Sequence, residues 1–191
     1  MPTIECEKLS LPKLDEEIKN IAEPKEVSAF FHLYEDFLES PHGEENCNVT
    51  QWTGFTVNDQ TFSLAAPMDT VNPIHSDPVT QRLILAAQVS NGKVNKDDSA
   101  ISGEGLKVQM LNGKEINLVK KDGKLMANDM EVNDVISSGN ATIFVLEYFL
   151  FVSSSDICDG IGRIHKREGV VHTPWGSHPY VEDNSPTGQS D

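Results

Sequence analysis

The stretch that decides the fold runs from residue 106 to residue 127 and reads LKVQMLNGKEINLVKKDGKLMA. Apolar residues alternate with polar residues on both sides of Asn112-Gly113, as in half-buried β-strands. Asn-Gly, and the Asp-Gly at residues 122–123, accept the positive backbone angles that tight hairpin turns require. The stretch therefore predicts two successive β-hairpins that form an antiparallel meander.

Further strands are expected on both sides of this meander. Residues 130–132 continue the alternating pattern, and residues 142–152 are apolar on both faces, which suits a strand buried inside a sheet. Upstream, apolar residues alternate with smaller or polar ones, so residues 60–66 predict a buried strand that ends at Pro67. A shorter strand is expected at residues 55–57.

Three segments have helical periodicity instead. Large apolar residues recur at three- and four-residue steps from residue 27 to residue 38, and Pro24 suits the first position of such a helix. The segment predicts an amphipathic helix whose aromatic stripe packs against a sheet. A second helix is expected at residues 78–89, and a short one at residues 14–21.

These elements divide the chain of 191 residues into three parts. Residues 1–23 are expected to be an N-terminal arm or a short helix, and residues 24–152 to be one folded domain. Residues 153–191 are rich in Ser, Gly and Pro and predict a partly disordered C-terminal tail. Whether residues 153–181 dock on the domain stays open.

The composition limits the partners of this chain. With 15 Lys+Arg against 30 Asp+Glu, the formal net charge is −15 and the isoelectric point is near 4.7. Such a chain repels phosphate backbones and anionic lipid surfaces, so we expect no nucleic-acid partner. A hydrophobic share of 38% allows a packed core.

Neither a leader nor a membrane span is expected in the chain as given. The first residues lack the basic start and apolar run of a secretory signal, and residues 141–152, interrupted by Glu147, are too few to cross a bilayer. Cys6, Cys47 and Cys158 are an odd number at wide spacings, which leaves their disulfide state open.

Three segments, in order, resemble the fasciclin-like domain, a family of adhesion and ligand-binding modules. Residues 62–71, FSLAAPMDTV, resemble its first signature, F-T-V-F-A-P-T-D-x-A. Residues 92–132 are similar to its central region, from Gly-Lys-Val through the Leu-Asn-Gly turn, and residues 140–150, NATIFVLEYFL, resemble the second signature, N-G-V-I-H-V-I-D-x-V-L. The signature positions in this chain are Phe62, Ala66, Pro67, Asp69, Asn112, Gly113, Asn140 and Phe144.

The resemblance implies an α+β fold, a wedge of two small β-sheets with several helices packed on one side. It implies a non-catalytic adhesion or interaction module that binds a protein or glycan partner outside the cell, at its surface or in a vacuole, although the missing leader leaves a cytoplasmic location open. The alternative is a soluble carrier of an apolar ligand such as a carotenoid or lipid. Glycosylation sequons at Asn48 and Asn140 matter if the protein enters the secretory route.

This copy departs from the family in three ways. Residues 71–87 leave little room for the helices that usually follow the first signature, so the domain is shortened. The tyrosine-histidine pair associated with integrin recognition in animal members aligns with Ala87-Gln88, so that function is not carried over. Phe144 replaces the histidine of the second signature, and we expect it to fill the space by packing.

Other chemistry has little support. Residues 95–99 carry alternating oxygen ligands, but Ala100 and Leu106 stand where a calcium loop requires glycine and a bidentate glutamate. No carboxylate pair is localised and no Gly-x-Ser-x-Gly turn frames a nucleophile, so we predict no enzyme, no metal site and no cofactor. A zinc site would need four residues whose spacing matches no ordinary site: Cys158, His165, His172 and His178.

Overall fold

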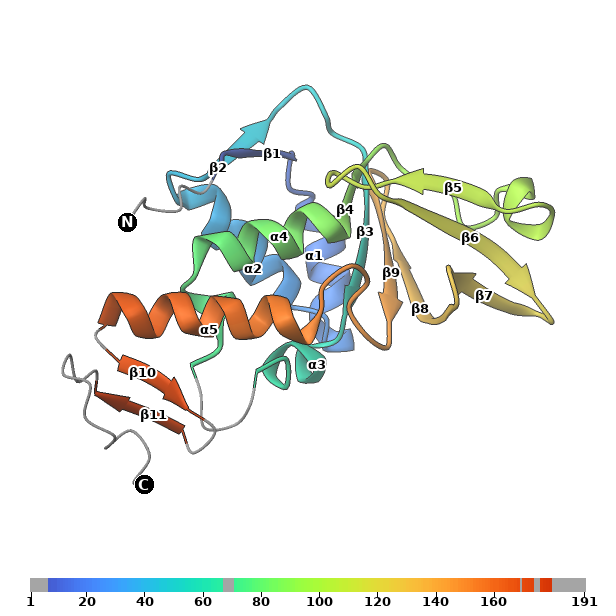
Figure 1. The fold of residues 1–191 in the computed structure, drawn as a ribbon. Coiled ribbons are helices and arrows are strands. Elements are labelled where there is room, and N and C mark those ends of the chain that lie inside the picture. The colour runs from blue at the N-terminus through green and yellow to red at the C-terminus, as the bar shows by residue number, and fades with distance from the viewer. Residues whose placement is uncertain (1–6, 67–70, 169, 174–175, 180–191) are drawn as a thin grey trace.

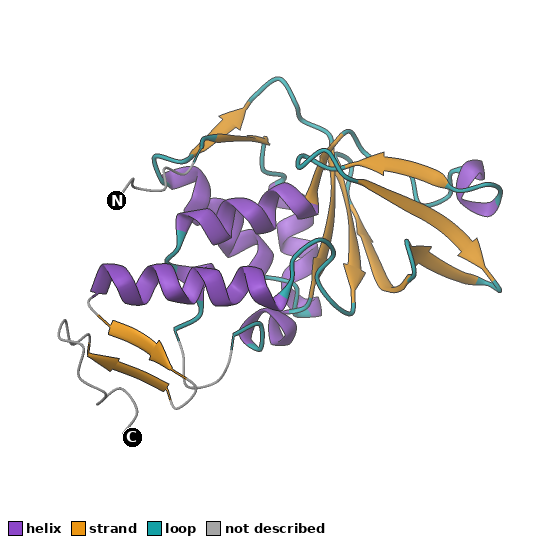
Figure 2. Ribbon diagram, viewed as in Figure 1, coloured by secondary structure: helices purple, strands orange, loops and turns teal. Residues whose placement is uncertain are grey.

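The computed structural model describes residues 7–66, 71–168, 170–173 and 176–179 (Figure 1). Its α-helices lie together on one side of the main sheet, and the short turn η3 (Ser99–Ser102) lies at the far end of the sheet (Figure 2), so the expected α+β class is confirmed. The elements in chain order are β1 (Leu9–Pro12), α1 (Glu16–Ala22), η1 (Glu23–Lys25), α2 (Ala29–Glu39), β2 (Gly43–Asn46), β3 (Trp52–Val57), α3 (Asp59–Ser63), η2 (Pro73–His75), α4 (Pro78–Gln88), β4 (Val89–Asn91), η3 (Ser99–Ser102), β5 (Leu106–Gln109), β6 (Glu115–Lys121), β7 (Lys124–Ala127), β8 (Met130–Ser137), β9 (Ala141–Leu146), α5 (Ser154–Glu168), β10 (Val170–Thr173) and β11 (Gly176–Pro179).

The main sheet has seven strands in the order β4-β3-β9-β8-β7-β6-β5. Strand β8 belongs to two halves of this sheet, because its start pairs with β7 and its remainder pairs with β9. An irregularity between Val132 and Asp134 separates the two pairings, and a bulge of this kind bends a strand and increases its twist. The half containing β5 to β7 therefore diverges from the half containing β3, β4 and β9 (Figure 1).

The expected meander is confirmed by its two turns. Asp122 and Gly123, with φ of 54° and 80°, form the two-residue loop between β6 and β7, as the Asp-Gly pair predicts. Between β5 and β6, Gly113 N donates to Met110 O at 2.9 Å, and Gly113 has a φ of 84°. This is a three-residue hairpin loop with glycine at its left-handed position.

The helices cover one face of β3 and β9 through an aromatic core. The fully buried ring of Trp52 lies between 5.5 and 6.5 Å, centroid to centroid, from the rings of Phe30, Phe31 and Tyr34 on α2. Tyr34 Oη donates to the carbonyl oxygen of Pro12, which ties strand β1 to the same core, and burial raises the pKa of Tyr34. The aromatic stripe of α2 is thus part of the core, as its periodicity predicts.

Helix α2 begins later than expected, because the sequence suggested that its first position would be Pro24. Pro24 lies in the short turn η1, and α2 starts at Ala29. The Asp59 carboxylate accepts hydrogen bonds from the backbone N–H groups of Ser28 and Ala29 at 2.8 and 2.7 Å. A carboxylate at this end satisfies orphan amides and favours the helix dipole, so a residue distant in sequence sets the start.

The buried strand predicted at residues 60–66 is wrong. This segment begins with helix α3, whose Asn58 side chain accepts a hydrogen bond from Thr61 N at 2.9 Å, and Leu64 is 63% exposed. The buried strand lies earlier, at Trp52–Val57, where all six residues are buried. Strand β9 is interior as expected, but it ends at Leu146 and not at residue 152.

The packed body continues beyond residue 152, where we expected it to end. Residues 154–168 form α5, the long helix beside α4 in Figure 1. Its buried residues Ile157, Ile161 and Ile164 recur at helical spacing, and Gly160 allows close contact with Thr80. After α5, strands β10 and β11 pair antiparallel.

The N-terminal segment is also part of the body. Strand β1 pairs parallel with β2, and α1 confirms the short helix expected there. The Asp15 side chain caps α1 by accepting from Glu17 N at 3.0 Å, and it accepts a hydrogen bond from the Ser138 hydroxyl. The described part of residues 1–23 is thus an ordered segment and not a free arm.

Candidate functional site: a groove between two sheet edges

The edge strands β4 and β5 meet at one end and separate toward the other. Leu111 N donates to Val89 O at 2.9 Å, and Ser90 Oγ donates to Gln109 O at 2.6 Å. Beyond these contacts no backbone hydrogen bond joins the two strands within the described residues. The sheet is thus almost closed on itself, and we call the opening between residues 91–95 and residues 106–109 the seam groove.

The hydrogen-bond pattern shows which backbone groups of β5 face the seam groove. Met110 N donates to Lys114 O at 2.8 Å, so Met110 forms a bonded pair with β6. Bonded and non-bonded pairs alternate along an antiparallel ladder, so Val108 also bonds to β6. Lys107 and Gln109 therefore direct their N–H and C=O groups away from β6, and the contact of Gln109 O with Ser90 agrees with this direction.

The same reasoning applies to β4. Gly92 N donates to Gln51 O at 2.9 Å, so Gly92 forms a bonded pair with the chain before β3. Alternation then turns the backbone groups of Val89 and Asn91 away from β3. Val89 O meets Leu111 N, whereas Asn91 faces the seam groove. Two strand edges thus face one opening. Within the described residues the N–H groups of Lys107, Gln109 and Asn91 are unpaired there, whereas Gln109 O and Asn91 O accept from Ser90 Oγ at 2.6 and 3.5 Å.

The seam groove has room for a peptide segment. Its volume is about 630 Å³, and Val94, Leu106 and Val108 supply apolar lining. One residue of a packed strand occupies ~160 Å³, from a rise of ~3.3 Å, a strand spacing of ~4.8 Å and a sheet spacing of ~10 Å. The groove therefore holds about four residues of an extended chain.

The charged residues of the seam groove are mainly basic. Lys93 Nζ donates to Ser138 O at 2.6 Å, so its position is fixed by the turn before β9. Lys107 is exposed and forms no ion pair with a described carboxylate. Asp98, also at the groove, accepts a hydrogen bond from Ala100 N at 2.9 Å and caps η3. Lys107 is thus available to an anionic group of a ligand.

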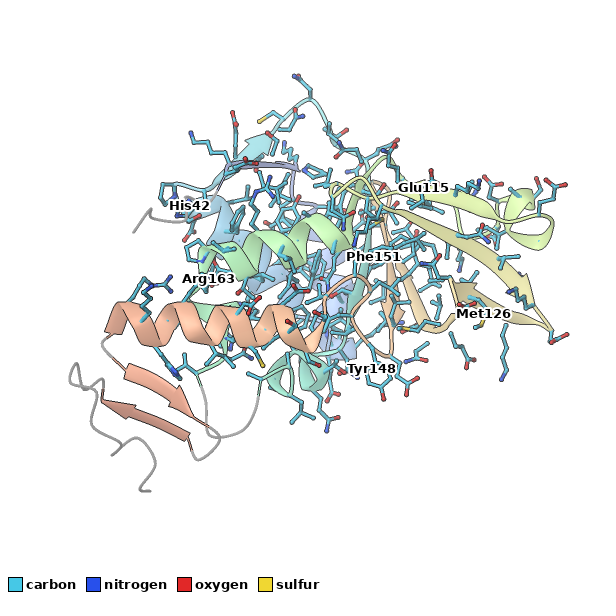
Figure 3. The ribbon with its side chains drawn as sticks, in the orientation of Figure 1. His42, Glu115, Met126, Tyr148, Phe151 and Arg163 are labelled. Carbon is cyan, nitrogen blue, oxygen red and sulfur yellow. The ribbon has the colours of Figure 1, made fainter. Side chains whose placement is uncertain are left out.

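A second charged cluster is structural. Asp77 is fully buried and forms ion pairs with Arg163 at 2.9 Å and Arg167 at 3.1 Å, while Thr80 Oγ1 donates to it at 2.6 Å. Burial alone would raise the pKa of Asp77, but the hydrogen bonds from Arg163, Thr80 and Arg167 lower it below its ordinary value. The ionised carboxylate holds α5 against the start of α4; Figure 3 labels Arg163.

A cleft of about 240 Å³ between α2, α3 and η2 brings His32, Asp36, Asp59 and His75 to its lining. Asp59 is committed to the start of α2, as described above. No group of three or more His, Cys, Asp or Glu side chains in the described part of the chain could hold a metal ion. The titratable residues of this cleft therefore form no metal-binding group among the described residues.

The candidate calcium residues, and those candidate zinc residues whose side chains are described, form no metal-binding group. Asn95 Oδ1 accepts a hydrogen bond from Asp97 N at 2.9 Å, so it stabilises its own turn. On α5, Cys158 is exposed whereas His165 is buried. His172 and His178 lie on β10 and β11, of which only the backbone is described.

The signature positions do not form one site. Phe62 is buried on α3 with its ring 5.1 Å from that of Phe149, and Ala66 is also buried. Pro67 and Asp69 lie outside the described residues. The remaining signature positions are separate: Asn112 and Gly113 are exposed in the hairpin loop, Asn140 is exposed in the turn before β9, and Phe144 is buried.

Phe144 on β9 is a core residue packed beside Phe55 on β3. Its ring stacks on Phe55 at 4.9 Å with an interplanar angle of 14°, and its exposure is 0%. Partners in register on β3 and β9 place both rings on the face opposite the helices. Ala87 and Gln88, which align with the tyrosine-histidine pair of fasciclin-like domains, are also buried.

The two sequons differ in accessibility. Asn48 and Thr50 are both exposed in the loop before β3. Asn140 is exposed, but the Thr142 hydroxyl is buried and donates to Val94 O at 2.8 Å. Among the described cysteines, Cys47 and Cys158 are free thiols, and the neighbouring Glu45 raises the pKa of Cys47.

The residues of the seam groove were not anticipated from the sequence. Lys107 and Gln109 read as ordinary polar positions of an alternating strand, and Asn91 reads as a residue of a loop. Whether their backbone groups are free to bind a ligand depends on the distance between the two edges of the sheet, and no local sequence pattern indicates that distance. The only available signal is the meander itself, which predicts that β5 is an edge strand.

Comparison with known proteins adds no family to this description. No protein-family model matches the chain, and no curated protein sequence matches it. Within the described residues, no helix combines the length and the apolar character needed to cross a membrane.

Proposed function

We propose that this protein is a non-catalytic interaction module that binds an extended segment of a partner protein in the seam groove. The observation that carries the proposal is the pair of strand edges that face one opening with unpaired backbone groups. A strand edge of this kind is a template for pairing with another chain. Proteins that bind peptides by strand addition use such edges for affinity and neighbouring pockets for specificity.

The chemistry of the groove favours a protein segment over a glycan. The N–H and C=O of Lys107 and the N–H of Gln109 face the groove with the spacing of a β-ladder, which a polypeptide matches directly, whereas Gln109 O already accepts from Ser90 Oγ. Apolar lining from Val94 and Leu106 suits alternate side chains of that segment. Lys107 favours an acidic residue beside them. The expected partner segment is therefore extended, with alternating apolar residues and at least one Asp or Glu.

We also propose that the chain is a divergent fasciclin-like domain, with its first signature in a different register. Residues 52–59 read WTGFTVND and align without a gap to F-T-V-F-A-P-T-D, with Thr53, Phe55 and Asp59 identical. In the structure this stretch is a buried strand that runs into the capped start of α3. Such a module would act outside the cell, at its surface or in a vacuole, and the exposed sequon at Asn48 is compatible with that route.

The proposal is tested with peptides selected against the full chain. Twelve-residue random peptides displayed on phage are selected for binding, and the winners are synthesised and titrated by calorimetry. Lys107→Pro removes the outward N–H without breaking the ladder to β6, whereas Lys107→Gln keeps the N–H and removes only the charge. We expect Lys107→Pro to weaken binding about tenfold or more and Lys107→Gln only a few-fold.

Two results would contradict the proposal. One is a selection that yields peptides binding equally well to the protein with Lys107→Pro. The other is binding of neutral or acidic oligosaccharides, but of no peptide, at the same residues.

A further inference from the structure

A separate cleft lies on the other side of the hairpin loop that borders the seam groove. Its volume is about 430 Å³, which is within the range of sites for small organic ligands. Helix α4, the hairpin loop before β6 and the segment after β9 form its walls, and Figure 3 labels Phe151 in that last segment. The lining residues used below are Arg82, Leu83, Lys114 and Phe151.

Two cations face this cleft in a strongly acidic protein. Arg82 Nε donates to the carbonyl oxygen of Glu7 at 2.8 Å, and its Nη2 lies 3.7 Å from the Glu7 carboxylate. A guanidinium has five N–H donors, and the Glu7 side chain is 86% exposed, so this pair leaves Arg82 with donors to spare. Lys114 makes no ion pair with a described carboxylate. Glu7 also lines the cleft and offsets Arg82 in part, so the lining carries two cations and one exposed carboxylate.

Phe151 presents an aromatic ring to the same cleft. Lys114 Nζ lies 5.2 Å from the centroid of the Phe151 ring, so the ring and the cation are adjacent. The backbone of Phe151 has a φ of 63°, a left-handed conformation that is unfavourable for a large side chain. Strain of this kind persists where the surrounding structure enforces it, and it is often found at ligand sites.

We infer that this cleft binds a small organic anion that carries a flat apolar body, such as an aromatic carboxylate. The anionic group lies between Arg82 and Lys114, and the flat body lies against Phe151 and Leu83. This site is independent of the seam groove, and its test is independent of peptide binding. No covalent step is involved.

The probe is 2-naphthoate, titrated into the isotope-labelled full chain and followed by amide chemical shifts. We expect saturable shifts at Arg82, Lys114 and Phe151, and binding about tenfold weaker or more for the neutral analogue 2-naphthylmethanol. Arg82→Gln and Lys114→Gln should each raise the dissociation constant of 2-naphthoate several-fold to tenfold, because each variant loses one charge-assisted contact. Both residues lie at the surface, so neither change is expected to unfold the protein.

Lys124→Gln is the matched control, because Lys124 is an exposed lysine of β7 that does not line the cleft. It should leave the dissociation constant unchanged. Phe151→Gly relieves the left-handed strain and removes the ring, so it should weaken binding about threefold to tenfold. Absence of saturable shifts at millimolar probe, shifts confined to other residues, or wild-type affinity in both Arg82→Gln and Lys114→Gln would overturn the inference.

Discussion

Two glycines on α5 allow a direct test of how this helix is docked. A Cβ added at Gly160 would lie 2.3 Å from Thr80 Oγ1 and 2.7 Å from Pro73 Cβ, whereas a Cβ added at Gly162 meets nothing within 4 Å. Alanine is preferred over glycine in a helix by about 1 kcal/mol at either position. Overpacking a close contact costs ~1–3 kcal/mol, and Thr80 cannot move freely because it also bonds Asp77.

Gly162→Ala should therefore raise the free energy of unfolding by about 1 kcal/mol, and Gly160→Ala should lower it by up to ~2 kcal/mol. Urea unfolding followed by circular dichroism measures both, and the two midpoints should differ by about 1 M. The helix propensity gain is common to both variants, so their difference isolates the packing of α5 on α4 and η2. Equal stabilisation of both variants would refute the docking of α5.

Three further changes test the packing of the body. Asp77→Asn leaves Arg163 without its buried partner and should cost ~2–4 kcal/mol at neutral pH. The pKa of Asp77 is lowered in the folded state, so the ionised side chain stabilises the fold fully above its unfolded pKa of ~3.9 and loses this effect as the pH falls through the folded pKa. The free energy of unfolding of the variant should therefore decline less steeply at acid pH than that of the wild type. Gly113→Val places a β-branched residue at a φ of 84° with no steric neighbour, and urea melts should show a loss of about 1–2 kcal/mol from backbone strain alone. Phe144→Ala should cost ~3–5 kcal/mol by removing the ring stacked on Phe55, and Phe144→His should also lower the thermal midpoint, since its nitrogens would be buried; unchanged midpoints would place Phe144 outside the core.

The elements that depend on local signals were predictable. The meander follows from Asn112-Gly113 and Asp122-Gly123, because the positive φ of Gly113, Asp122 and Gly123 fixes the turns. Helices α2 and α4 follow from apolar residues at three- and four-residue steps. In these segments the local pattern and the tertiary environment agree, which is why sequence alone is sufficient.

The error at residues 60–66 has a clear cause. Phe62, Leu64 and Ala66 alternate like a strand, but Asn58 provides a capping side chain and a helix starts at Asp59, one residue before the predicted strand. Leu64 then points to solvent, so the alternation carries no information about burial. In a segment this short, a capping signal outweighs an apparent period of two.

Helix α5 was not predicted because of the composition of residues 153–168. Ile157, Ile161 and Ile164 have helical spacing, but two glycines and a serine run lower the apparent helix propensity of the segment. Gly160 is required by the close contact with Thr80, which is visible only in the structure. The partner of Arg163, Asp77, lies 86 positions away in the sequence, so the ion pair could not be inferred either.

The seam groove could not be predicted for a related reason. It requires that the sheet curl until its first and last strands, β4 and β5, approach each other at one end only. The bulge in β8, which bends the sheet between its two halves, is seen only once β8 is paired with β9, a long-range feature. The sequence indicates an edge strand but not what lies opposite it.

Amide hydrogen exchange at β5 tests the central claim most directly. In the free protein Val108, which bonds to β6, should exchange slowly, whereas Lys107 and Gln109, which face the seam groove, should exchange rapidly although they lie in the same strand. Saturation with a selected peptide should protect Lys107, Gln109 and Asn91 together. Slow exchange of Lys107 and Gln109 in the free protein, or exchange that stays rapid in the complex, would contradict the account.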